Sequence, residues 1–135
     1  MDLSSKLIAS IDAGVDGAIV ILDGNGKNPL MWVMPTTKIK LKGKTPQGND
    51  KFRSELNLGE IRQILLGTDG SERDCVSHVF IEKQQPNYKP QLMRCGGCGR
   101  PVTSTTAAGI SSTFQTGRNV GLLEGLIAGM KISYT

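Results

Sequence analysis

Two acidic residues end stretches that are otherwise apolar. Asp12 closes the apolar part of residues 7–13, and Glu82 closes that of residues 76–83. An ionised carboxylate is costly to bury alone, so such a residue usually meets a metal ion, a cation or backbone donors. Carboxylate oxygens are hard ligands of the kind that Mg²⁺ prefers. If the two segments are neighbouring parallel strands, both carboxylates lie at one edge of a sheet and form a candidate metal site.

The strands that position these acids follow from apolar runs and turn residues. Residues 7–13 and 17–23 predict a β-hairpin closed by a tight Gly-containing turn, and residues 30–34 predict a third strand. The connections are too short for crossovers, so these three strands form an antiparallel meander. Residues 76–83 predict a fourth strand, and residues 131–135 begin a fifth.

Two helices are expected between the strands. Asn57 and Glu60 predict a capping box that starts a short amphipathic helix, which Gly67 closes. Residues 110–130 predict the main helix. Four glycines recur in it at every fourth position: Gly117, Gly121, Gly125 and Gly129. Because Gly costs about 1 kcal/mol relative to Ala inside a helix, we interpret this stripe as a surface that packs closely against a sheet, a partner helix or a phosphate.

Basic residues are segregated from the acids. The net charge is +4, and residues 36–53 hold six Lys or Arg residues against Asp50 alone. Residues 83–123 hold five basic residues and no acid. Two basic segments around acids on apolar strands fit a polyanion with a metal at its centre, so we predict contact with nucleic acid. Solvated surface lysines are the alternative.

The length and composition fit one α/β domain spanning residues 1–135, with two insertions. Residues 36–53 form either a basic loop or a short edge ribbon that its lysines protect. Residues 84–106 form a polar loop. No apolar run approaches the ~18 residues of a membrane span, and the first residues lack a signal peptide pattern. We therefore expect a cytoplasmic protein with no membrane partner.

Cys95 and Cys98 have the spacing of a zinc knuckle, which needs four ligands. Cys75 and His78 are the other candidate ligands, but Cys75 lies at the start of a strand whose far end leads into the 84–106 loop. Two Cys95 and Cys98 pairs from two subunits would meet more easily. Structural Zn²⁺, a redox pair and reduced loop thiols remain open interpretations.

Four segments, in order, resemble the RuvC-like Holliday junction resolvases, especially their phage-type branch. They are Ile11 to Ala18, Met34-Pro35, Ile81 to Gln84, and Gly109 to Gly125. The resemblance implies an RNase H-like fold: a five-stranded mixed sheet flanked by helices, with antiparallel strands one to three, parallel strands four and five, and strand one central. It also implies a Mg²⁺- or Mn²⁺-dependent crossover junction endodeoxyribonuclease. Such enzymes act as homodimers on branched DNA, in a bacterial or phage-infected cell.

The same resemblance implies roles for individual residues. Asp12 matches the first-strand metal carboxylate of the family and Glu82 the fourth-strand one, so both become candidate catalytic metal ligands. Two metal ions held there can activate a water and stabilise the leaving oxygen of a phosphodiester. The candidate phosphate-binding residues are Lys38, Lys40, Lys42, Lys44, Lys83 and Arg118, and they predict a salt-sensitive affinity.

The family carries further carboxylates on a helix after the fifth strand, and this chain ends before that helix. We therefore expect a C-terminally truncated RNase H-like domain with weak or no nuclease activity of its own. Asp16, in the turn after the first strand, is close enough to contribute a ligand. A second chain that supplies the missing carboxylates remains an alternative, as does a non-catalytic module that binds branched DNA or a partner. A phosphate-binding lobe of an actin-like ATPase would need a second lobe, for which 135 residues leave no room.

Overall fold

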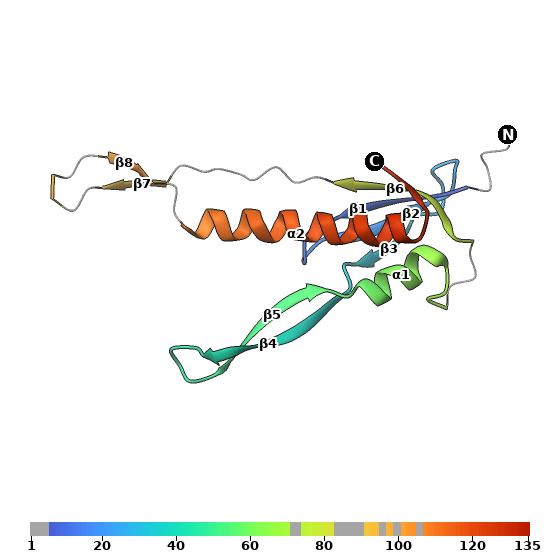
Figure 1. The fold of residues 1–135 in the computed structure, drawn as a ribbon. Helices are drawn as coiled ribbons and strands as arrows, with labels where there is room; N and C mark the ends of the chain where they lie inside the picture. The colour runs from blue at the N-terminus through green and yellow to red at the C-terminus, as the bar shows by residue number, and fades with distance from the viewer. Residues whose placement is uncertain (1–5, 71–73, 83–90, 95–96, 99–100, 105–106) are drawn as a thin grey trace.

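The computed structural model of the chain describes residues 6–70, 74–82, 91–94, 97–98, 101–104 and 107–135. A five-stranded mixed sheet forms the body, two helices pack on it, and two ribbons of two strands each project from it (Figure 1). The fold class of the described residues is therefore α/β, as the sequence predicts.

The central sheet has the strand order β3-β2-β1-β6-β9, which places β1 in the middle. An antiparallel meander is formed by β1 (Leu7–Asp12), β2 (Ala18–Leu22) and β3 (Leu30–Val33). β6 (Val76–Glu82) runs parallel to β1, and the short β9 (Ser133–Tyr134) runs parallel to β6. The predicted mixture of antiparallel and parallel pairs is confirmed.

Alternation along β1 separates a buried face of the sheet from an open one. Ala9 and Ile11 are fully buried, whereas Ser10 between them is exposed. Residues of the other strands and both helices complete the core on the buried face: Ile19, Ile21, Val79, Ile81, Ile61, Ile64, Leu65, Leu123 and Ile127. Burial of this apolar surface is the main stabilising contribution. Among the described residues, no helix covers the opposite face, where Met31 and Phe80 remain exposed.

The first helix, α1 (Leu58–Leu66), begins and ends where the sequence predicts. The Asn57 Oδ1 accepts a hydrogen bond from the Glu60 backbone N–H over 3.2 Å. Only this half of the capping box forms, because the Asn57 backbone N–H donates instead to the Pro35 carbonyl, 2.8 Å away. Gly67 adopts the left-handed conformation (φ 70°), and its N–H closes the last turn.

The second helix, α2 (Ala107–Gly129), starts three residues earlier than predicted. Leu123 and Ile127 are fully buried against the sheet. The glycine stripe lies on the opposite side, exposed to solvent, and a Cβ added at Gly121 or at any of its three partners would meet nothing within 4 Å. Packing of the stripe against the sheet is therefore wrong for the part of the chain that is described, whereas contact with a partner helix or a phosphate stays a prediction. No described helix is long and apolar enough to cross a membrane.

The basic segment folds as a two-stranded antiparallel ribbon, separate from the main sheet, built from β4 (Thr36–Lys44) and β5 (Asp50–Leu56). The prediction of a loop over 36–53 is wrong. The alternative prediction of a ribbon is correct. Its period-two alternation of Lys with Ile and Leu is the strand signal. The turn is closed by a hydrogen bond from the Gly48 N–H to the Thr45 carbonyl, 2.8 Å long, with Gly48 at φ 82°.

The predicted 84–106 loop contains a second antiparallel ribbon, formed by β7 (Gln91–Arg94) and β8 (Pro101–Ser104). Each strand has four residues, which is too short for an apolar period to show in the sequence. Cys98 lies in the connection between them and is exposed.

Candidate metal and nucleic-acid site

The parallel pairing of β1 and β6 brings the two candidate acids together. Asp12 pairs directly with Glu82, and each is the last residue of its strand. Neighbouring strands lie about 4.8 Å apart, and directly paired residues point to the same face of a sheet. Glu82 is exposed and Asp12 is half-buried. The structure therefore places both carboxylates side by side at the carboxyl edge of the sheet.

The turn between β1 and β2 fixes Asp12. Its Oδ1 accepts a hydrogen bond from the Gly14 N–H over 3.1 Å. The Gly17 N–H donates to the Gly14 carbonyl over 3.0 Å, and the Met34 N–H donates to the Gly17 carbonyl over 2.9 Å. A Cβ on Gly17 would lie 2.3 Å from the Asp12 carbonyl oxygen, so only glycine fits at this close approach. The turn thus holds the acid through backbone contacts on both sides.

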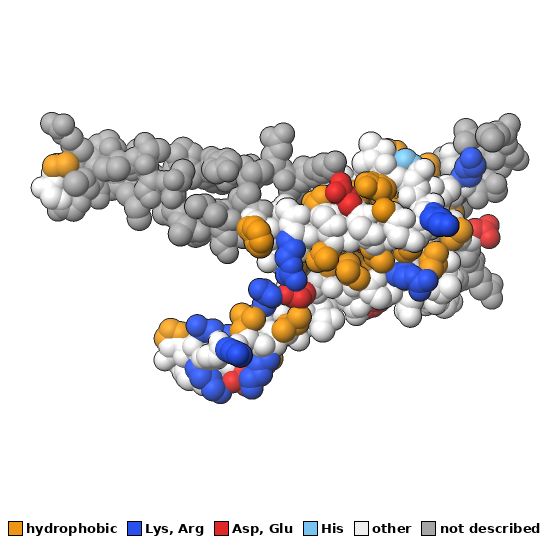
Figure 2. Space-filling view, in the orientation of Figure 1, with side chains coloured by type: hydrophobic (Ala, Val, Ile, Leu, Met, Phe, Trp, Pro, Cys, Tyr) orange, Lys and Arg blue, Asp and Glu red, His pale blue; other side chains and the backbone are white. Residues whose placement is uncertain are grey.

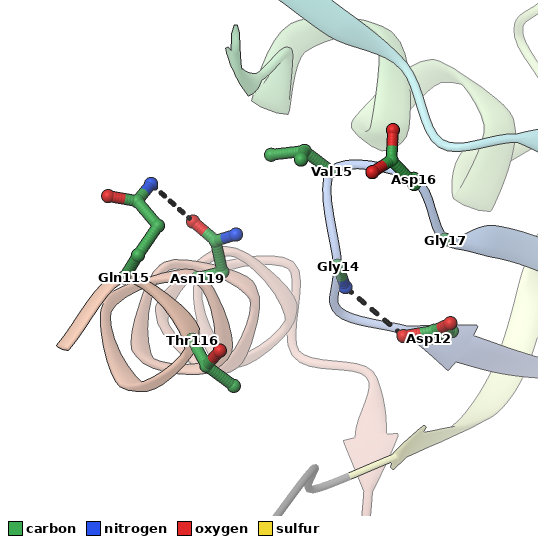
Figure 3. Close-up of a pocket in the computed structure, with 8 residues that line it drawn as sticks. All are labelled: Asp12, Gly14, Val15, Asp16, Gly17, Gln115, Thr116 and Asn119. Atoms are coloured by element: carbon green, nitrogen blue, oxygen red, sulfur yellow. Dashed lines mark hydrogen bonds between the residues drawn. The ribbon is translucent and has the colours of Figure 1, made fainter. Parts of the chain in front are cut away.

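A cleft opens beside Asp12, between this turn and α2 (Figure 3). Its lining consists of Asp12, Gly14, Val15, Asp16, Gly17, Gln115, Thr116 and Asn119. The structure thus brings the predicted Asp16 to the same cleft as Asp12. The three residues from α2 were not among the site residues predicted from the sequence. The available signal was a polar side chain at position 119 in a helical stripe that continues with Leu123 and Ile127, at four-residue spacing.

The ligand atoms of this site are of the type that a hard divalent cation prefers, although they are few. Asp12 and Glu82 offer carboxylate oxygens, which Mg²⁺ and Mn²⁺ favour. In the described ranges, no cluster of three or more His, Cys, Asp or Glu side chains could hold a metal ion. Water and phosphate oxygens would therefore have to provide most of the coordination, as is common for Mg²⁺.

Basic side chains gather on the β4–β5 ribbon (Figure 2). Two of them are paired with one acid: the Nζ atoms of Lys40 and Lys44 lie 2.6 Å and 2.5 Å from the two carboxylate oxygens of Asp50. Hydrogen bonds from Lys40 and then Lys44 lower the pKa of Asp50 below its ordinary value. Lys38 and Lys42 have no ionic partner among the described residues and are exposed. They are therefore available to phosphates.

Arg118 of α2 contacts the ribbon. Its Nη1 donates to the Glu55 Oε1 of β5 over 3.0 Å, and Arg53 pairs with the same carboxylate. The hydrogen bond from Arg118 lowers the pKa of Glu55 against the opposing effect of burial, and Arg53 adds to the lowering. Arg118, predicted to bind phosphate, thus also ties the base of the ribbon to α2.

Of four further candidates, the structure describes two. Lys83 and Cys95 lie outside the described residues. Cys98 is a free, exposed thiol on the β7–β8 ribbon. Cys75 is a free, exposed thiol directly before β6, and the beginning of β6 is its end away from that ribbon (Figure 1). The zinc site at Cys95 and Cys98 stays a prediction.

No protein-family model matches the chain, and no curated protein matches it. The geometry that remains is a pair of carboxylates at a sheet edge, a polar cleft beside one of them, and a projecting basic ribbon.

Proposed function

We propose that the chain is a Mg²⁺-dependent endonuclease of the Holliday junction resolvase type, which hydrolyses phosphodiesters in branched DNA. The observation that carries this proposal is the direct pairing of Asp12 with Glu82 at the ends of two parallel strands. The strand order, with β1 central and β6 beside it, supports the proposal, because it agrees with the order that the resemblance to such enzymes implies. The basic ribbon supports DNA as the substrate.

Each residue of the proposed centre has a separate task. Asp12 and Glu82 would hold Mg²⁺ or Mn²⁺ through their carboxylate oxygens. The metal, when bound, offsets the charge of the phosphate and lowers the pKa of water. Asp12 is already oriented by the Gly14 N–H, so little side-chain freedom is lost when it binds. Glu82 is exposed, which lets it orient a water that approaches from solvent.

The ribbon would hold the DNA on the same protein. Lys38, Lys42 and Lys51 are exposed and have no acidic partner among the described side chains. Three phosphate contacts predict that the logarithm of the binding constant falls with that of the salt concentration at a slope of about −3. As a homodimer the protein would present two metal centres and two ribbons to the arms of a four-way junction.

A non-catalytic module that binds branched DNA is the second candidate. The shortage of metal-ligating side chains in the described ranges favours it, since two carboxylates bind Mg²⁺ weakly. This candidate keeps the ribbon as the DNA-binding surface and gives the acid pair no chemical role.

Nicking of a labelled four-way junction in Mg²⁺ or Mn²⁺ separates the two candidates. The nuclease proposal predicts symmetrical nicks that D12N and E82Q abolish. The matched control is D74N. Asp74 is an exposed acid just before the first residue of β6, whereas Glu82 is the last residue of that strand, so D74N should leave the nicks unchanged. Binding of the junction without nicks, unaffected by D12N and E82Q, would contradict the nuclease and support the binding module.

A further inference from the structure

The cleft beside Asp12 contains a buried polar side chain whose hydrogen bonding is incomplete. Asn119 is 3% exposed. Its Oδ1 accepts a hydrogen bond from the Gln115 Nε2 over 3.5 Å, which is its only side-chain hydrogen bond with the described residues. Figure 3 shows the Nδ2 of Asn119 on the side of the cleft that faces Gly14. A buried donor requires an acceptor, which in the free protein is a water of the cleft and in a complex can be an oxygen of the ligand that displaces it.

The direction of the Asn119 amide is set by its neighbour on α2. Gln115 lies one helical turn earlier and donates to the Oδ1 of Asn119. With the Oδ1 on the side of Gln115, the Nδ2 and its two hydrogens lie toward the cleft (Figure 3). Gln115 therefore acts as a positioning residue for Asn119.

The chemistry of the cleft limits what the acceptor can be. A donor amide does not ligate a cation, so a metal ion is not its partner. Asp12 and Asp16 both belong to the lining of the cleft, and their negative charges disfavour a free anion there. A phosphate oxygen of a DNA strand that a metal ion holds at Asp12 fits both conditions. Gly14 lines the cleft without a side chain, so a sugar-phosphate backbone can approach the turn closely there.

We propose that Asn119 is a DNA-binding residue, whose Nδ2 donates a hydrogen bond to a non-bridging phosphate oxygen of the strand bound at Asp12 and Glu82. The proposal rests on the proposed function, because that function brings a phosphodiester to the cleft. It adds a contact from α2 that fixes the strand beside the metal centre.

Binding of a four-way junction in Ca²⁺, where affinity is measured apart from turnover, tests this contact. N119D replaces the donor by an acceptor of equal size and should weaken binding about tenfold or more, because hydrogen bonds to charged groups are strong. The matched control is N25D, which adds the same charge in an exposed turn and should change binding far less. Equal effects of N119D and N25D would overturn the proposal.

A second variant avoids a buried charge at position 119. In Q115E the new carboxylate only accepts, so the Asn119 Nδ2 turns toward it and away from the cleft. The proposal predicts a similar loss of affinity in Q115E, with a melting curve that confirms the fold. Unchanged affinity in folded Q115E would contradict it.

A scan of the DNA makes the test independent of protein variants. Single methylphosphonates, which remove the charge of one phosphate, are placed in turn around the nicking position. Wild type should lose affinity at a phosphate next to the scissile one, and N119D should show no further loss there. A scan in which no such phosphate matters to wild type would overturn the Asn119 contact. Failure of wild type to bind the junction at all would instead overturn the proposed function.

Discussion

Gly17→Ala tests the turn that holds Asp12. The added Cβ would lie 2.3 Å from the Asp12 carbonyl oxygen and 2.9 Å from the Gly14 carbonyl oxygen. Real Cβ atoms essentially never approach closer than 3.0 Å, so the backbone must open. Both neighbouring atoms belong to the backbone of the turn, and neither can move aside by a change of rotamer.

The cost of this opening follows from the contacts that it disturbs. Strain in a packed site costs about 1–3 kcal/mol. The hydrogen bonds from Gly17 to Gly14 and from Met34 to Gly17 add about 1 kcal/mol each when they weaken. We expect G17A to lower the free energy of unfolding by about 2–4 kcal/mol. The melting temperature should fall by about 8–16 °C, at about 4 °C per kcal/mol for a chain of this size.

Gly121→Ala is the matched control, because its Cβ enters open space on the exposed side of α2. It should stabilise the protein by up to about 1 kcal/mol, since Ala has the higher helix propensity. Chemical denaturation of both variants measures the two effects with opposite signs. A G17A protein within about 0.5 kcal/mol of wild type, the range of neutral surface changes, would refute the reasoning about the turn. A destabilised G121A protein would show that the glycine stripe packs against a partner in solution.

The ion pairs of the ribbon give two further predictions. D50N should release Lys40 and Lys44 for phosphates, so that DNA binding tightens and its salt dependence steepens. A salt titration of DNA binding measures both effects. D74N removes the same charge elsewhere, and an equal gain in affinity in D74N would contradict the prediction. Arg118 lowers the pKa of Glu55 below its ordinary value of 4.5. The ion pair between Arg118 of α2 and Glu55 of the ribbon should therefore be fully formed above pH 4.5 and be lost as the pH falls through the lowered pKa of Glu55. NMR signals of the Arg118 guanidinium should shift with that titration in wild type and not in E55Q. Guanidinium signals that do not change with pH in wild type would contradict the Arg118–Glu55 ion pair.

The sequence predicted the parts of the fold that depend on local patterns. Apolar runs predicted β1 and β6, the short connections predicted the antiparallel meander, and Asn57 and Gly67 predicted the ends of α1. The parallel part of the mixed sheet was expected only from the resemblance to resolvases. The position of Asp12 and Glu82 at strand ends was also visible, because an acid in an apolar run stands out. Their direct pairing, by contrast, depended on the resemblance to resolvases, since no local pattern states which strands are neighbours.

Other features of the site were not predictable from local patterns. The contact between Glu55 and Arg118 joins residues 63 positions apart, and no spacing rule reports such a pair. The basic segment was ambiguous because its alternating lysines fit a solvated loop as well as a ribbon. Packing of the glycine stripe against the sheet was wrongly expected, since spacing alone does not say which side of α2 faces the sheet. Asn119 was overlooked because an isolated amide in a helix has no chemistry until Asp12 is placed beside it.

Binding of Mn²⁺ at the Asp12 and Glu82 pair is the most direct test of the proposed centre. Paramagnetic broadening of backbone amide NMR signals detects even a weak site and locates it. The proposed function predicts that broadening at low Mn²⁺ concentration is centred on the carboxyl ends of β1 and β6, and that D12N and E82Q each remove it. Broadening centred on Asp50 of the ribbon, or a pattern that survives both substitutions, would contradict a metal centre at this edge of the sheet.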